Sequence, residues 1–380
     1  MSHTVPLELV FKIFEHVYYL PEGSPDRKTL AACAIVCKAW TSEAQRLLFI
    51  HTKIGSKGCA VATQIQYIIN KPALGTYIRS LQISVSPRRH PMYSRNYHIS
   101  EAEFVTLVSQ LSQLYQLTAR FMMTSLDATT VDKLSQIPLR LQAVDMMSSP
   151  STNSSVIYQL FEIWPSIQFL CVRMAIPDPP QDTPRPPFSL YELRMIYPMS
   201  RSALEWFIPP SQIDTAKPLQ ILDVGDMMTQ DYSEDLVLAH APRLRSLSIM
   251  NEPKSGFFDT FTCLEEFAMR CVPLSARTPP ETVQHLGLYV KLGDLVKPLL
   301  FTIAMIRTLP RLRCVTVHGI MERHKECEDL RAACREKGVD LVITNNPTMF
   351  ALPQQELVPV DTFPRVVRFT NLRKYNSPCS

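Results

Sequence analysis

Glycine is scarce in this sequence, with 10 glycines among 380 residues, whereas about 7% is usual in globular proteins. Phosphate-binding loops need closely spaced glycines, because the backbone must approach the phosphate, and neither GxGxxG nor GxxxxGKS/T occurs. The zinc-protease motif HExxH and the nucleophile motif GxSxG are also missing. These gaps exclude the common nucleotide-binding and hydrolase signatures, so we expect no cofactor and no catalytic residues.

Long apolar runs are missing as well. The longest apolar stretch, residues 299–306, is interrupted by Thr302 and flanked by Lys297 and Arg307, whereas a membrane helix needs about 20 apolar residues. The first residues have neither the basic nor the apolar segment of a secretory signal. The ten cysteines include no CxxC pair, which favours free buried thiols in a reducing compartment. We therefore expect a soluble chain in the cytoplasm or the nucleus, without a membrane partner.

Charge is nearly balanced, with 39 Lys and Arg residues against 35 Asp and Glu residues. The net charge of +4 is too small to indicate a nucleic-acid partner. Hydrophobic residues make up 46% of the chain, which is enough for a sizeable core. At 380 residues the chain exceeds one ordinary domain, which favours two or three units or one elongated repeat array.

The first fifty residues predict three short helices, over residues 5–17, about 26–36 and 38–49. Pro6 suits the first helical position, and Glu8 suits the positive end of the helix dipole. Apolar residues wrap more than one face of the first helix, which is more surface than two short neighbours can cover. That surface needs either the rest of the chain or another protein to cover it.

Three segments of this region follow a known pattern: Val5-Pro6-x-Glu8-Leu9-Val10-x-x-Ile13-Phe14, Val36-Cys37-Lys38-x-Trp40 and Leu47-Leu48-Phe49. They resemble the F-box over about an eighth of the chain, although Val5 stands where the family usually has Leu and the connection over residues 18–28 is long. The resemblance implies a three-helix unit that docks on a Skp-type adaptor, which links it to a cullin–RING ubiquitin ligase. The residues expected to form or support the docking face are Pro6, Glu8, Leu9, Val10, Ile13, Phe14, Val36, Cys37 and Trp40.

Burial of Ile13 and Phe14 would contribute about 1.5–3 kcal/mol each. Substituting both by Asp is therefore expected to abolish adaptor binding.

A second pattern, apolar-x-x-apolar-x-apolar, recurs through the rest of the chain at intervals of roughly 20–30 residues, which is typical of leucine-rich repeats. Such triplets also arise by chance, but the near-regular spacing and a preceding proline, as at Pro242 and Pro310, add weight. The copies are Ile78/Leu81/Ile83, a weaker Leu114/Leu117/Ala119, Leu141/Val144/Met146, Ile167/Leu170/Val172, Leu190/Leu193/Met195, Leu219/Leu222/Val224, Leu244/Leu247/Ile249, Leu264/Phe267/Met269, Val283/Leu286/Leu288 and Leu312/Val315/Val317.

Helical spacing between triplets, for example over 156–163 and 295–309, completes a strand–turn–helix unit. The sequence thus predicts an α/β protein with an F-box at 1–52, a leucine-rich-repeat-like solenoid of parallel strands plus helices at 53–344, and a partly ordered tail at 345–380. The Asn or Cys that regular repeats place after the third anchor is missing. An ordinary α/β domain with a parallel sheet is the alternative.

These patterns together predict the substrate-recognition subunit of an SCF-type cullin–RING ubiquitin ligase. The client protein, whose identity is unknown, would bind the concave strand surface through residues between the anchors. The candidates are Gln220, Asp223, Arg245, Ser248, Glu265, Arg270, His285 and Arg313. The alternatives are an adaptor-bound scaffold without ligase activity and a thiol or metal hydrolase. For the latter, His318, His324, Cys327 and Cys334 lie close in sequence but match no known metal-site spacing, so we expect no metal.

Overall fold

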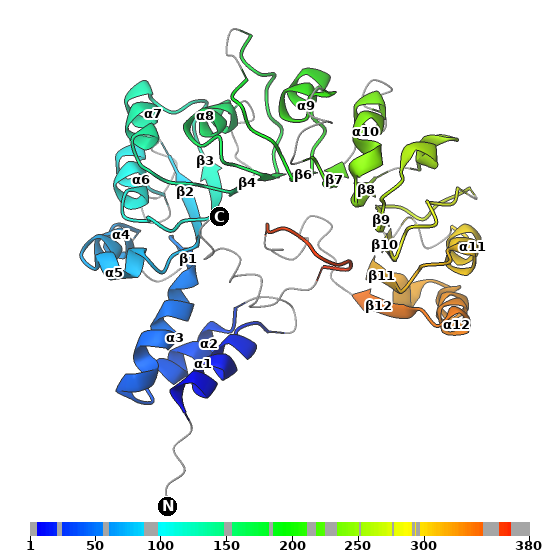
Figure 1. The fold of residues 1–380 in the computed structure, drawn as a ribbon, viewed down its shortest axis with the longest axis horizontal. Coiled ribbons are helices and arrows are strands. Elements are labelled where there is room, and N and C mark those ends of the chain that lie inside the picture. The colour runs from blue at the N-terminus through cyan, green and yellow to red at the C-terminus, as the bar shows by residue number, and fades with distance from the viewer. Residues whose placement is uncertain are drawn as a thin grey trace, which may run out of the picture.

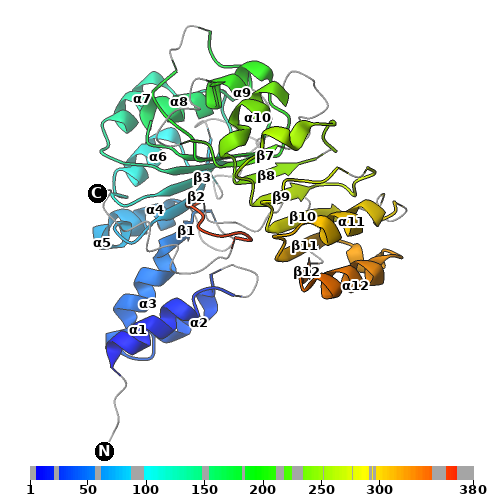
Figure 2. The same cartoon turned by 45° about the vertical axis from the view of Figure 1, so that its right-hand side comes forward.

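The computed structural model describes residues 6–20, 25–55, 61–86, 98–147, 154–181, 185–210, 218–224, 234–250, 252–275, 277–290, 293, 297–344 and 357–365. The main feature of the described chain is one curved sheet of 12 strands with helices on its outer side (Figure 1). The strands line the inside of an arc, and the first three helices extend from one end of it (Figure 2).

The order of strands in the sheet follows their order in the chain, from β1 to β12, and adjacent strands are parallel. A doubly wound α/β domain reverses its strand order at a switch point, and this sheet shows no reversal. The fold is therefore α/β and solenoid-like. The strands are β1 (His51–Lys53), β2 (Ser80–Val85), β3 (Gln116–Phe121), β4 (Ala143–Met146), β5 (Phe169–Val172), β6 (Glu192–Met195), β7 (Ile221–Val224), β8 (Ser246–Ile249), β9 (Glu266–Met269), β10 (His285–Val290), β11 (Cys314–Gly319) and β12 (Asp340–Thr344).

The second and third anchors of each predicted triplet lie on one strand from β2 to β11, and the first anchor lies two residues before it. This includes the weaker copy, whose strand is β3. Pairing in register places the second anchors in one continuous row, each with no exposed surface. Leu222, for example, lies between Leu193 and Leu247. The row comprises Leu81, Leu117, Val144, Leu170, Leu193, Leu222, Leu247, Phe267, Leu286 and Val315. No single unit could bury its anchors alone, so the stack shares one core.

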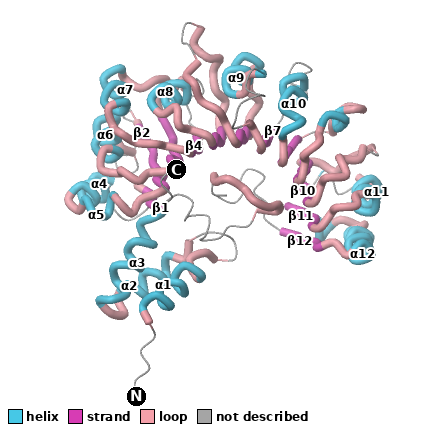
Figure 3. Tube along the Cα trace, in the orientation of Figure 1, coloured by secondary structure: helices cyan, strands magenta, loops and turns pink. Residues whose placement is uncertain are grey.

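Helices cover the convex side of the sheet (Figure 3). Local signals explain where several begin and end: Ser100 and Glu103 form a capping box at the start of α6, and Gly338 ends α12 with a φ of 69°. The helices beyond the N-terminal unit are α4 (Val61–Ile69), α5 (Pro72–Gly75), α6 (Glu101–Val108), α7 (Ala128–Ser135), α8 (Val156–Ile163), α9 (Arg201–Phe207), α10 (Glu234–His240), α11 (Leu300–Thr308) and α12 (Cys327–Lys337). Among the described residues, no helix has the length and apolar character needed to cross a membrane.

Three helices, α1 (Leu7–His16), α2 (Arg27–Ala34) and α3 (Lys38–Ile50), form the N-terminal unit. The Asp26 side chain caps α2 by accepting a hydrogen bond from the Thr29 N–H at 3.0 Å. The unit has a core of its own, separate from the solenoid core, which consists of Val10, Phe14, Tyr18, Leu30, Ala44, Leu47 and Ile50. The last residue of α3 is followed directly by the first residue of β1, so the unit is joined to the solenoid without a loop.

Candidate functional site

Large apolar side chains are exposed mainly on the N-terminal unit. Of the twelve such side chains among the described residues, seven lie between Leu7 and Val36. Leu9 and Ile13 are 50% and 54% exposed, and Val17, at the end of α1, is 37% exposed. Their spacing of four residues puts them on one side of the helix. We call Leu9, Ile13 and Val17 the apolar stripe.

The turn between α2 and α3 adds two more exposed apolar residues. Ile35 is 87% exposed and Val36 is 60% exposed. Both are β-branched, and the α2 helix ends just before them, whereas the sequence predicted helix through Val36. Because these side chains are exposed to solvent, they contribute no burial free energy to the folding of this chain. These residues therefore suit contact with another molecule better than they suit packing within this chain.

The structure divides the predicted adaptor-binding residues into exposed and supporting ones. The exposed ones are Pro6, Glu8, Leu9, Ile13, Val36 and Cys37. Val10 and Phe14 are 6% and 3% exposed and belong to the core of the unit. The Phe14 ring meets the half-buried Trp40 ring edge to face, with 5.3 Å between their centroids. The expected test by Ile13→Asp with Phe14→Asp is therefore unsuitable, because a buried carboxylate at position 14 would unfold the unit.

The concave side of the sheet carries the residues between the anchors in three registered rows. The first row immediately precedes the strands and is joined by backbone hydrogen bonds such as that from the Arg245 N–H to the Gln220 carbonyl at 2.8 Å. From β3 to β11 it runs Tyr115, Gln142, Gln168, Tyr191, Gln220, Arg245, Glu265, Gln284 and Arg313. The second row includes Ala143, Phe169, Glu192, Ile221, Ser246, Glu266, His285 and Cys314. The third includes Thr118, Asp145, Cys171, Arg194, Asp223, Ser248, Ala268, Gly287 and Thr316.

All but one of the predicted client-binding residues belong to these rows. Gln220, Arg245, Glu265 and Arg313 lie in the first row, His285 in the second, and Asp223 and Ser248 in the third. Arg270 directly follows β9.

Several of these side chains are paired within the protein. Arg270 donates to Asp223 at 2.6 Å across one intervening strand, β8, and Arg245 donates to Glu265 at 2.6 Å. Arg313, in contrast, is exposed. The concave face is thus a network of internal ion pairs rather than a row of free charges.

Glu192 is the centre of the charge network at the middle of the sheet. It has no exposed surface and accepts hydrogen bonds from Arg194 and from Arg365 in the C-terminal part of the chain, the latter at 2.9 and 3.2 Å. Burial lowers the pKa of Arg365, and the nearby Arg194 guanidinium lowers it further. Burial also lowers the pKa of Arg194, but attraction to Glu192 and the smaller contributions of Cys171 and Asp223 together outweigh it and leave that pKa raised. One carboxylate therefore holds two guanidinium groups that repel each other.

A second polar network spans β8 to β11. His285 contacts Glu266 through Nδ1 at 2.5 Å and Thr316 Oγ1 through Nε2 at 2.9 Å. Burial raises the pKa of Glu266, but the hydrogen bond and charge of His285, with smaller contributions from Arg365 and Ser246, together outweigh it, so the pKa is lowered. The Thr–His–Glu connection resembles a catalytic relay, but strand backbone N–H groups here are used in the parallel ladder and cannot form an oxyanion hole. We assign the network to holding Glu266 ionised.

A segment distant in sequence covers part of the concave face. Residues 357–365, here called the strap and drawn in red, lie inside the arc (Figure 1). Leu357 packs with Ala143, Phe169 and Cys171, and its carbonyl accepts a hydrogen bond from the Tyr115 hydroxyl at 3.1 Å. The sequence reasoning placed 357–365 in a partly ordered tail and did not predict this contact.

Residues that hold the strap were also missed. Tyr115, Phe169, Cys171, Tyr191 and Glu192 were not among the predicted client-binding residues. The triplet pattern could have identified these residues, because they occupy the same positions between anchors in the earlier triplets.

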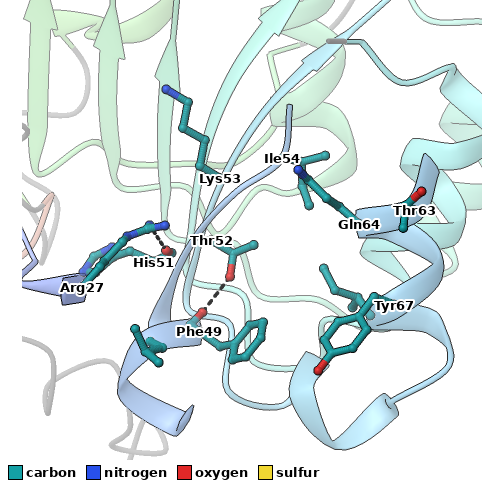
Figure 4. A pocket seen from close by; sticks show the side chains of 11 residues that line it. Arg27, Phe49, His51, Thr52, Lys53, Ile54, Thr63, Gln64 and Tyr67 are labelled. Atoms are coloured by element: carbon teal, nitrogen blue, oxygen red, sulfur yellow. Dashed lines mark hydrogen bonds between the residues drawn. The ribbon is translucent and has the colours of Figure 1, made fainter. Parts of the chain in front are cut away.

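A cavity of about 450 Å³ lies where the N-terminal unit joins the solenoid (Figure 4). Residues of α3, β1 and α4 line it, including Phe49, Ile54 and Tyr67. The Arg27 guanidinium donates to the His51 carbonyl, and Thr52 Oγ1 donates to the Phe49 carbonyl at 2.8 Å. Burial, with a smaller effect of the Arg27 charge, lowers the pKa of His51 to about 4. Neutral His51 is thus part of the joint between the two units.

The thiols and imidazoles considered for a hydrolase occupy structural positions. Burial raises the pKa of the Cys314, Cys327 and Cys334 thiols, which opposes formation of a nucleophilic thiolate. His324 Nε2 contacts the Lys297 carbonyl at 2.8 Å. In the part of the chain that the structure describes, no group of three or more His, Cys, Asp or Glu residues could hold a metal ion.

Comparison with known proteins gives no family. No protein-family model matches the chain, and no curated protein has a significantly similar sequence.

Proposed function

We propose that the chain is the substrate-recognition subunit of an SCF-type cullin–RING ubiquitin ligase. Residues 1–52 act as an F-box that docks a Skp-type adaptor, and the leucine-rich-repeat-like solenoid binds a client protein. The observation that carries the proposal is the apolar stripe, which lies exposed on a three-helix unit that already has its own core. The chain works in the cytoplasm or the nucleus and contributes no active site.

Exposure of the apolar stripe to water is unfavourable in free energy. Soluble proteins rarely expose clustered large apolar side chains unless another molecule covers them. Leu9 and Ile13 stand four residues apart on α1, the spacing with which a helix presents anchors to a hydrophobic groove. Burying each would contribute about 1.5–3 kcal/mol. Phe14 and Trp40, packed behind them, hold the helix in place for this contact.

Ligase action then requires only proximity. The adaptor holds one end of the chain and the solenoid holds the client, so the charged ubiquitin-carrying enzyme reaches a high local concentration near client lysines. α3 ends at Ile50 and β1 begins at His51. Because no flexible loop separates them, the client would be held in a defined direction relative to the adaptor.

The experiment is co-expression with a Skp-type adaptor followed by calorimetric titration of the purified partners. Ile13→Asp introduces a charge into the proposed contact and should weaken binding by about a hundredfold or more. Leu300→Asp is the matched control, because Leu300 is 64% exposed on α11 of the solenoid. It should bind as the wild type does. The docking proposal fails if folded Ile13→Asp retains wild-type affinity or if both variants lose affinity equally.

The scaffold alternative makes a different prediction for the assembled complex. A ligase subunit brings a cullin into the purified complex, and that complex transfers ubiquitin to a bound protein in vitro. An adaptor-bound scaffold would give adaptor binding without transfer. A hydrolase would label a single hyper-reactive cysteine with a thiol probe or contain stoichiometric zinc, and the buried thiols described above give it no support.

A further inference from the structure

Three apolar side chains of the strap are almost fully buried. Leu357, Val358 and Phe363 are 2%, 4% and 8% exposed. Leu357 fills an apolar site on β4 and β5 that Tyr115 and Tyr191 flank. The Arg245 guanidinium lies over the Phe363 ring, 5.4 Å from its centroid. These contacts give the strap apolar anchors at both ends.

Three side chains of the first concave row form hydrogen bonds with the strap backbone. The Tyr191 hydroxyl accepts a hydrogen bond from the Val360 N–H at 3.1 Å. Arg245 donates to the Val360 carbonyl at 2.8 Å and to the Asp361 carbonyl at 3.0 Å. Tyr115 donates to the Leu357 carbonyl. Because these bonds are made to the backbone, another extended segment could form them whatever its side chains.

One contact selects a particular side chain. Arg365 places Nη1 2.9 and 3.2 Å from the two carboxylate oxygens of Glu192. Glu192 is also bound by Arg194, so it keeps a partner when Arg365 leaves. Departure of Arg365 would also relieve its repulsion with Arg194. The site at Glu192 can therefore release Arg365 and accept another arginine.

From these contacts we propose that the concave face from β3 to β8 is a groove for an extended peptide, that the strap occupies it as an internal ligand, and that the client replaces the strap with a segment of the same chemistry. That segment carries an aliphatic residue for the Tyr115–Phe169–Tyr191 site, an extended backbone for Tyr191 and Arg245, and an arginine for Glu192. The inference rests on the proposed function, since it names the kind of client that the solenoid receives.

The test uses the full chain and a fluorescent peptide with the sequence of residues 357–365, Leu-Val-Pro-Val-Asp-Thr-Phe-Pro-Arg. In the wild type, the tethered strap acts at an effective concentration on the order of millimolar, so micromolar peptide should not bind. Leu357→Asp with Phe363→Asp removes both buried anchors and should raise peptide affinity by about tenfold or more. The exposed neighbour Thr362 supplies the control, Thr362→Asp, which should behave as the wild type does.

Changes in the peptide and in the groove then test the assigned contacts. A peptide ending in Glu instead of Arg should lose binding to the Leu357→Asp/Phe363→Asp variant, because it places a second carboxylate against Glu192. A peptide ending in Lys should bind several-fold more weakly, because an ammonium group is more strongly hydrated than a guanidinium group and costs more to bury. Adding Tyr191→Phe removes one hydroxyl, whose partner is the Val360 backbone, and should also weaken binding.

The inference is wrong if the folded Leu357→Asp/Phe363→Asp variant binds the peptide no better than the wild type does. It is also wrong if the Arg and Glu peptides bind that variant equally well. If the double variant does not fold, Arg365→Gln takes its place, and its peptide affinity must still exceed that of the wild type. No adaptor is present in this assay. If the peptide assay fails but the adaptor still binds, the groove proposal is wrong and the docking proposal stands. If the adaptor does not bind but the peptide assay succeeds, the docking proposal is wrong and the groove proposal stands.

Discussion

Glu192 illustrates how position in the sheet gives a charged residue its role. It lies on β6 with Phe169 and Ile221 beside it in the same row, so its carboxylate is shielded from solvent. A buried carboxylate without a partner would be very costly. Two guanidinium groups compensate here, and only one of them, from Arg194, belongs to the sheet.

Sequence reasoning could find the concave residues but not their pairs. The positions between the triplet anchors correctly placed Arg245, Glu265 and Asp223 on one face. The pairing of Asp223 with Arg270 depends on strands two apart in the sheet, and local patterns carry no information on such cross-strand contacts. The predicted set began at Gln220 and did not include Tyr115 and Tyr191, which contact the strap.

His51 gives a prediction of pH dependence. Its pKa is about 4 in the folded chain because of burial, against about 6.5 when unfolded. The unfolded state therefore binds more protons between these values, and stability falls as the pH drops through this window. His51→Gln should reduce the loss of unfolding free energy between pH 7 and pH 5 by roughly 1–2 kcal/mol, as measured by urea unfolding.

The matched control for this measurement is His16→Gln, on the exposed side of α1. It should leave the pH dependence as in the wild type. An unchanged pH dependence in His51→Gln would show that the imidazole of His51 is not held neutral at the joint.

At the level of elements, the strands were predictable because their anchors form rows that are buried along the whole sheet. The triplets located β2 to β11. β1 was missed because its three residues, His51–Lys53, contain no apolar pattern. The strap was missed because it has prolines and no periodicity, and its position depends on complementarity to distant strands.

Two glycines with positive φ provide a prediction at the same scale. Gly319 ends β11 with a φ of 97°, and a Cβ there would lie 2.3 Å from the Val290 carbonyl oxygen. Gly338 ends α12 with a φ of 69° and has open space at the Cβ position. Gly338→Ala should cost about 1 kcal/mol from backbone strain alone. Gly319→Ala should cost about 3 kcal/mol, because neighbouring strands must also move.

Urea unfolding of both alanine variants compares the two costs directly. Equal destabilisation would mean that the carbonyl contact at Val290 is relieved without displacing the strand.

At the scale of the whole molecule, two surfaces with different chemistry lie on different parts of the chain. The apolar stripe belongs to the helices that extend from the β1 end of the arc, and the peptide groove lies inside the arc (Figures 1 and 2). Their separation allows two partners to bind at once. The direct junction of Ile50 and His51 couples the directions of the two surfaces, which is the geometry that proximity-driven transfer requires.

The measurement that tests the central claim most directly is hydrogen exchange of the full chain with and without a Skp-type adaptor. The account predicts new protection on α1 and at the turn containing Ile35 and Val36, where backbone and apolar side chains become covered. Exchange in β3 to β8 should be unchanged. Protection confined to the concave strands, or no protection of α1 at saturating adaptor, would contradict the assignment of the apolar stripe as the docking surface.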